Sequence, residues 1–209
     1  MPIYIYKGNS QISTNPIRNT KVVKAMYAKE QGKDIVCVWG IDRSIPYDKM
    51  FTYTVSNDKI TITGLKPEVK TSSIIIPDTI SNKQVSFIAN SAFENNSKIV
   101  TITIPDSVTN IGLWAFSGCT GLTSVTIGNS VMGISTGAFY GCTGLTSVTI
   151  PDSVTYIGDS VFYNCTSLTS INFNGTKAQW NAVSKGSNLV KNAGTSQVNC
   201  TDGIVQIWK

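Results

Sequence analysis

The sequence contains no histidine among its 209 residues, which removes the commonest general base from any candidate active site. Neither a Ser-His-Asp triad nor a Cys-His pair can form without it. No glycine-rich phosphate loop lies between an expected strand and an expected helix. We therefore expect that the protein is not an enzyme and that it binds no cofactor.

Cysteine is too sparse and too widely spaced for a metal centre. The chain has five cysteines, and the shortest interval between two of them is 23 residues. Structural zinc sites use four ligands in closely spaced pairs, and no CxxC pair is present. We expect no metal site.

Long hydrophobic runs are also missing. No apolar stretch approaches the roughly 18 residues of a membrane span, so we expect no membrane insertion. The first residues, MPIYIYKGNSQIS, lack the charged segment and apolar core of a secretory signal. The protein is expected to stay inside the cell or to leave by a route without a cleaved signal, such as release in a phage particle by lysis.

Charge is scarce, and the basic excess lies at the front of the chain. Charged residues make up 14% of the sequence, against about 25% in an average soluble protein. Residues 1–70 hold 11 basic and 6 acidic side chains, whereas residues 71–209 hold 6 of each. No basic helix or aromatic-basic motif accompanies the excess, so nucleic acid is not expected as a partner. The lysines and arginine either form a solvated strand face or dock to an acidic partner; the candidate docking residues are Lys7, Arg18, Lys21, Lys24, Lys29 and Lys33.

The dominant positive feature is an internal repeat of 23 residues. The stretch AFSGCTGLTSVTIGNSV (115–131) returns as AFYGCTGLTSVTIPDSV (138–154), and seven apolar columns persist over four turns. One column consists of phenylalanines, Phe93, Phe116, Phe139 and Phe162. Each turn also holds one alternating segment, at 101–104, 124–127, 147–150 and 170–173, which predicts a strand with one buried face. The IGLWAF and IGDSVF stretches are expected to be short and irregular or 3₁₀.

A second column, Asn96, Cys119, Cys142 and Cys165, has residues of modest size that can donate a hydrogen bond. We expect an inward ladder of reduced side chains that satisfies backbone carbonyls in the turn after each phenylalanine. Asp78, Asp106 and Asp152 follow proline in the IPD turns, where we expect each to bond its own turn backbone.

The stretch IPDSVTNIGLWAFSGCTGLTSVTI (104–127) resembles the BspA-like leucine-rich repeats of bacterial surface proteins. The resemblance covers about residues 50–209, with YTVSNDKITITGL (53–65) similar to the capping hairpin of such arrays. It implies a mainly β fold: a short leucine-rich-repeat solenoid with repeats of about 23 residues, a parallel β-sheet on one face and capping hairpins. It also implies adhesive binding to host proteins or partner cells.

The repeat defines the expected domains. Residues 1–48 are predicted to be a small N-terminal β module for docking, which weakly resembles the anchor segments of phage tail and fibre proteins. Within it, two strands are expected around a polar loop from Glu30 to Asp34. Residues 49–209 form the repeat domain, with an N-terminal cap at 49–72, repeats at 73–176 and a C-terminal cap at 177–209. In that last cap we expect a short helix carrying Trp180 and a hairpin with Asp202 and Gly203 in its turn.

Two sets of side chains are candidates for a ligand-binding surface. One is an uncharged column of exposed strand positions, Thr103, Thr126, Thr149 and Asn172. The other consists of aromatic residues that vary between repeats, Trp114, Tyr140, Tyr156 and Tyr163. Exposed aromatic residues at variable positions suit recognition of protein or glycan.

Three hypotheses of function follow. The first is a phage virion protein whose front module docks to particle proteins and whose repeats bind a protein or glycan on a host surface. The second is a bacterial adhesin or surface antigen, located on the cell surface or secreted. The third is a structural decoration protein that packs against its neighbours. Whether a second copy of the chain is also a partner stays open.

Overall fold

The computed structural model describes residues 4–7, 10–13, 26–30, 33–37 and 47–207, with side chains from residue 49 onward. The chain forms two compact units, residues 1–41 and 42–209. The domain boundary that we expect after residue 48 stays a prediction.

The first unit contains two antiparallel strand pairs. Strand β1 (Tyr4–Lys7) pairs with β2 (Ser10–Ser13), and β3 (Met26–Glu30) pairs with β4 (Lys33–Cys37). The two expected strands around the polar loop are therefore confirmed, although the loop is shorter because Lys33 and Asp34 belong to β4. Of the candidate docking residues, Lys7, Lys29 and Lys33 lie in these strands, whereas Arg18, Lys21 and Lys24 lie outside the described residues.

The second unit opens with the cap that the sequence predicted. A short helix α1 (Tyr47–Met50) leads into β5 (Phe51–Ser56), which pairs antiparallel with β6 (Lys59–Leu65). Asn57 and Asp58 join the two strands with φ angles of 48° and 63°. Positive φ at both central residues is the geometry of a type I′ turn, which Asn and Asp tolerate better than most residues do.

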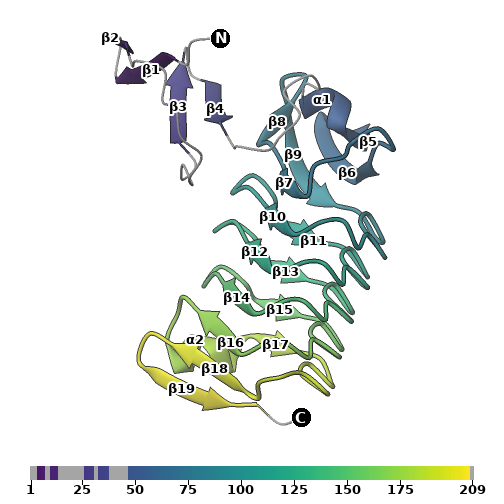
Figure 1. Cartoon of the computed structure of the whole chain (residues 1–209). Coiled ribbons are helices and arrows are strands. Elements are labelled where there is room, and N and C mark those ends of the chain that lie inside the picture. The colour runs from purple at the N-terminus through teal and green to yellow at the C-terminus, as the bar shows by residue number, and fades with distance from the viewer. Residues whose placement is uncertain (1–3, 8–9, 14–25, 31–32, 38–46, 208–209) are drawn as a thin grey trace. The chain divides into compact units, whose positions relative to one another are not determined.

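The alternating segments of the repeat form one sheet of seven strands (Figure 1). Its parallel strands are β7 (Ser73–Ile75), β10 (Thr101–Thr103), β12 (Ser124–Thr126), β14 (Ser147–Ile150), β16 (Ser170–Phe173) and β18 (Gln197–Cys200). The edge strand β19 (Gly203–Gln206) pairs antiparallel with β18. The predicted strands and their parallel pairing are confirmed.

A second sheet, which the sequence did not predict, runs beside the first along the array (Figure 1). It contains β9 (Lys83–Ile88), β11 (Asn110–Ile111), β13 (Gly133–Ile134), β15 (Tyr156–Ile157) and β17 (Ser184–Lys185) in parallel. The cap strands β5 and β6 extend this sheet, and β8 (Thr79–Ile80) pairs with β9. The IGLWAF and IGDSVF stretches were expected to be irregular, and this was wrong for their first residues, Ile111 and Ile157, which belong to β11 and β15. Two residues per repeat are enough to form a strand of this sheet, because neighbouring repeats align.

The phenylalanine column forms the centre of the core. Phe93, Phe116, Phe139 and Phe162 are all buried, and successive rings stack with centroids 5.1, 5.2 and 5.8 Å apart. The stacked rings lie within 10° of parallel. Each repeat thus buries its ring against the next repeat and could not bury it alone.

The cysteine column forms the inward ladder that we expected. The Sγ atoms of Cys119, Cys142 and Cys165 each donate to the carbonyl of a phenylalanine in the preceding repeat, at 3.1 Å in every case. All three thiols are buried and free. Asn96 departs from the expectation, because its Oδ1 accepts from the Lys98 N–H and no earlier phenylalanine turn exists for it to contact.

The aspartate after the IPD proline makes its hydrogen bond to the next repeat and not to its own turn. Asp106 accepts the backbone N–H of Asn129, one repeat further along the chain. The expectation of a local turn contact was therefore wrong for Asp106, because stacking brings the next repeat's backbone within reach of the carboxylate.

The C-terminal cap contains the predicted helix, α2 (Lys177–Ala182), and its buried Trp180. Thr176 caps the helix, and the Trp180 ring meets Phe173 edge to face at 5.3 Å. The hairpin β18–β19 is also present, but its loop is Thr201–Asp202, since Cys200 pairs with Gly203. The expected turn was therefore wrong by one residue.

Candidate functional site

The exposed hydroxyl column lies on the seven-stranded sheet as a single row in register. Thr103, Thr126, Thr149 and Asn172 face one another across adjacent strands, which are about 4.8 Å apart. Among the described residues, the hydroxyls of the three threonines have no protein hydrogen-bond partner. Asn172 accepts a bond from the side chain of Asn199 at 3.0 Å. The row is therefore a flat, uncharged surface whose hydroxyls are free to bond to solvent or to a ligand.

A neighbouring threonine column shows what a purely structural hydroxyl does in this fold. Thr123, Thr146 and Thr169 each donate to the carbonyl at the same position of the preceding repeat, at 3.1 to 3.2 Å. Their hydroxyls are therefore already bonded within the array and do not donate to a ligand. The contrast marks the first column, and not the second, as available to a partner.

Three of the four candidate aromatic residues come together along the turn edge of the array. The Trp114 and Tyr140 rings meet edge to face with centroids 5.4 Å apart, and Tyr140 stacks on Tyr163 at 5.0 Å. Trp114 is 37% exposed, and the two tyrosines are half-buried. We call Trp114, Tyr140 and Tyr163 the aromatic row.

Trp114 occupies an unusual backbone position. Its φ is +55°, in the left-handed region that bulky residues avoid, and its column otherwise contains Ser91, Gly137, Ser160 and Asn188, with φ from 53° to 64°. The ring lies over Gly137, where an added Cβ would meet it within 2.3 Å. The glycine therefore makes room for the indole.

Tyr156 does not join the aromatic row. It lies in β15 of the other sheet, 45% exposed, in register with Gly133 of β13 and Ser184 of β17. Met132, which directly precedes β13 and is 49% exposed, was missed by the sequence reasoning. The sequence could have identified Met132, because this residue interrupts a column that has threonine at positions 109 and 155.

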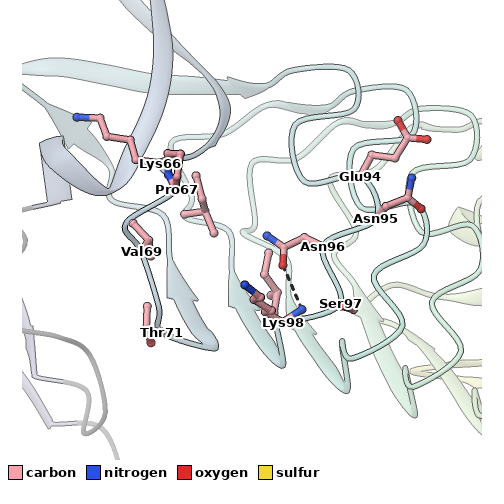
Figure 2. Close-up of a pocket in the computed structure, with 11 residues that line it drawn as sticks. Lys66, Pro67, Val69, Thr71, Glu94, Asn95, Asn96, Ser97 and Lys98 are labelled. Atoms are coloured by element: carbon pink, nitrogen blue, oxygen red, sulfur yellow. Dashed lines mark hydrogen bonds between the residues drawn. The ribbon is translucent and has the colours of Figure 1, made fainter.

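A cleft of about 370 Å³ opens where the N-terminal cap meets the first turn of the array (Figure 2). The cap side contributes Leu65, Lys66, Pro67, Val69 and Thr71. The turn side contributes the residues from Glu94 to Ile99. Sequence reasoning did not find this cleft, because its walls come from two segments with different patterns.

The titratable groups show no catalytic constellation among the described residues. Burial raises the pKa of Cys119 and of Cys165 to about 12, and burial with the neighbouring thiols raises that of Cys142 further. The pKa of Asp159 is lowered by hydrogen bonds from the Ser187 side chain and backbone. Within the part of the chain that the structure describes, no group of three metal-ligating side chains converges and no helix could span a membrane.

Comparisons with known proteins agree with the architecture. The family model described as "BspA type Leucine rich repeat region" matches residues 86–200 in six copies. A leucine-rich repeat protein of T. pallidum is 30% identical, with a TM-score of 0.64 over 72% of this chain and 68% of its own. One from Bacteroides capillosus is 31% identical, with a TM-score of 0.54 over 61% of this chain and 96% of its own.

A more distant likeness concerns the fold alone. The pneumococcal vaccine antigen PcpA is 21% identical, with a TM-score of 0.54 over 74% of this chain and 49% of its own. No curated protein matches the chain significantly. Nothing in these comparisons supports a phage particle.

Proposed function

The chain belongs to the BspA-type leucine-rich repeat family, and from this premise we propose that it is a non-enzymatic adhesin of a bacterial surface. Its repeats would bind a protein exposed on a host or partner cell. Support comes from the solenoid, which offers extended surfaces built from regularly spaced side chains. Further support comes from the free hydroxyls and aromatic rings that the array exposes.

The observation that carries the proposal is the exposed aromatic row. A left-handed residue other than glycine costs on the order of 1–3 kcal/mol, and such strain gathers at functional sites. Trp114 bears that strain without filling the core, since its ring is partly exposed and lies over Gly137. Tryptophan and tyrosine also dominate the binding energy of protein interfaces. We place the centre of the binding surface at this row.

The test replaces Trp114 with serine, which is the residue found in its column at positions 91 and 160. We expect Trp114→Ser to weaken adhesion to intact target cells at least tenfold, because an aromatic hot spot contributes about 2 kcal/mol or more. Its thermal stability should stay about equal, because serine already occupies this left-handed position at residues 91 and 160, each with a φ of 54°. Undiminished adhesion by the folded variant would remove the aromatic row from the proposal.

A matched variant separates the row from the hydroxyl surface. Thr126→Lys places a charge in the middle of the threonine column, which lies on the seven-stranded sheet and not in the turns that carry the aromatic row. If Thr126→Lys abolishes adhesion and Trp114→Ser does not, the binding surface is the seven-stranded sheet. Enzymatic removal of glycans from the target cells distinguishes a glycan ligand, because binding to a protein ligand should persist.

The phage and decoration hypotheses stay predictions without support from the comparisons. The phage hypothesis assigns particle docking to the N-terminal module and its basic residues, whereas the decoration hypothesis assigns packing against neighbouring proteins to the repeats. The truncation experiment described below tests that assignment directly.

A further inference from the structure

The turns of the array bond to one another with a fixed polarity. The backbone N–H groups of Phe93 and Asn95 donate to the carbonyls of Ala115 and Ser117 in the following repeat, at 2.7 Å each. Later turns repeat this pattern, with Gly118 donating to Tyr140 and Gly141 to Tyr163. The carbonyls of every turn therefore project toward the preceding turn, and the first turn has no predecessor.

The cleft lies at this open end of the turn ladder. The carbonyl of Glu94 stands where Ser117 stands in the next repeat, and among the described residues it accepts no hydrogen bond. Gly64 of the cap closely approaches the backbone carbonyl of Ala92, and the neighbouring Phe93 is 2% exposed. The cap thus closes the apolar part of the open end and leaves the polar part, beside Glu94, accessible.

Asn96 gives the cleft a free donor. In the later repeats this column holds cysteines, and each thiol donates to the carbonyl of a phenylalanine in the repeat before it. Asn96 has no such carbonyl to contact, and its Oδ1 is engaged by the Lys98 N–H at 3.1 Å. Its Nδ2 has no partner among the described residues, and Figure 2 shows it turned toward the wall that carries Pro67 and Val69.

A cation and an apolar wall complete the arrangement. The side chain of Lys98 extends from the same wall as Asn96 toward Val69 and Thr71 (Figure 2), and no carboxylate of the described residues pairs with it. Lys66 also lines the cleft, although its ammonium group extends away from it (Figure 2). Leu65, Pro67 and Val69 provide apolar contact opposite the donors. A volume of about 370 Å³ falls within the usual range of ligand pockets.

We propose that this cleft binds the C-terminal residues of a peptide, with the terminal carboxylate held by Lys98 and Asn96. A backbone N–H of the peptide donates to the carbonyl of Glu94, as the turn of a preceding repeat would. The last side chain, which must be apolar, packs on Leu65 and Val69. Capture of a terminal carboxylate together with backbone pairing is an established mode of peptide recognition. This site is separate from the aromatic row and does not depend on the proposed adhesion.

The test uses the full chain labelled with ¹⁵N and acetylated tetrapeptides that end in leucine, valine or phenylalanine. We expect the peptides with a free carboxylate to shift the side-chain amide signals of Asn96. Peptides with an amidated C-terminus should bind at least tenfold more weakly, because a charge-assisted hydrogen bond is lost. Equal binding of the two forms, or no binding at millimolar concentration, would overturn the proposal.

Variants locate the site. Lys98→Gln should weaken the free-carboxylate peptides about tenfold, and Asn96→Ser should weaken them severalfold. Lys191→Gln is the matched control, since it removes another exposed lysine from the last turn and should change nothing. Trp114→Ser should also leave peptide binding intact, which separates this site from adhesion. If glucuronate shifts the Asn96 signals and the peptides do not, the cleft recognises an acidic sugar and the peptide assignment is wrong.

Discussion

At the scale of the residue, the cysteine column has no catalytic role, yet each of its thiols makes the same structural hydrogen bond. Each thiol of Cys119, Cys142 and Cys165 is buried and donates a single hydrogen bond to a backbone carbonyl. The thiol is small enough to fit between stacked turns, and it gives a second hydrogen bond to a carbonyl that already accepts a backbone N–H of its own turn. Its raised pKa is a consequence of the same burial.

The raised pKa predicts a stability that falls at alkaline pH. The pKa of Cys119 is about 12 in the folded protein and 9.0 without the fold, so the folded state holds its proton more tightly. The contribution of this thiol is complete below pH 9 and is lost between pH 9 and about 12, at roughly 1.4 kcal/mol per pH unit. We expect the melting temperature to fall less steeply above pH 9 in Cys119→Ala than in the unsubstituted protein. Parallel curves for the two proteins would contradict the burial of the thiol.

At the scale of the element, the stacked phenylalanines bind each turn to the next. Phe139 is fully buried between Phe116 and Phe162, with ring centroids 5.2 and 5.8 Å away. A repeat contacts only its two neighbours, so a ring removed from the middle of the column weakens both interfaces at once. The cooperativity of the array therefore rests on continuous columns and not on any single strand.

Phe139→Ala is expected to destabilise the protein by about 3–5 kcal/mol, through lost burial and a cavity between two rings. Chemical denaturation monitored by circular dichroism measures this change. The adjacent half-buried Tyr140 provides the control, because Tyr140→Ala removes an aromatic ring without opening the core and should cost much less. If the two variants lost equal stability, the column would not be the core of the array.

At the scale of the whole molecule, charge and repeat separate along the chain. The basic excess lies in residues 1–70, and the repeats are close to neutral. The chain divides into two compact units between residues 41 and 42, and the second unit carries its own cap and its own core. Folding and recognition by the repeats should therefore be independent of the first unit.

A truncated protein of residues 42–209 should fold alone and keep its adhesion to target cells. Its melting temperature should lie within a few degrees of that of the full chain, because each repeat packs only against its neighbours and the core of the described residues runs from Met50 to Val198. If the N-terminal unit docks to a larger assembly, as the phage hypothesis requires, the truncated protein should fail to join that assembly. Normal incorporation of the truncated protein would show that the repeats dock, and would favour the decoration hypothesis.

The sequence alone determined the repeat, its length, the strands of the first sheet and the inward columns. It could do so because each repeat packs only against copies of itself, so position 139 has the same environment as position 116 or 162. The same reasoning identified the hydroxyl column and the buried cysteines. Within the repeat it missed the second sheet and the contact of Asp106 with the next turn, because both depend on how neighbouring turns stack. Outside the repeat it failed at Asn96, which has no preceding turn, and at the last hairpin, whose loop is displaced by one residue.

The tertiary structure alone decided which surface residues act together. Trp114, Tyr140 and Tyr163 occupy two different columns, and the left-handed backbone at Trp114 and the space above Gly137 bring the indole against Tyr140. Tyr156, of the same chemical type, lies on another sheet. The cleft likewise required two unrelated segments, the cap loop and the first turn, to meet. A periodic sequence specifies contacts between equivalent positions, whereas contacts between unlike positions depend on backbone geometry and on where the periodicity ends.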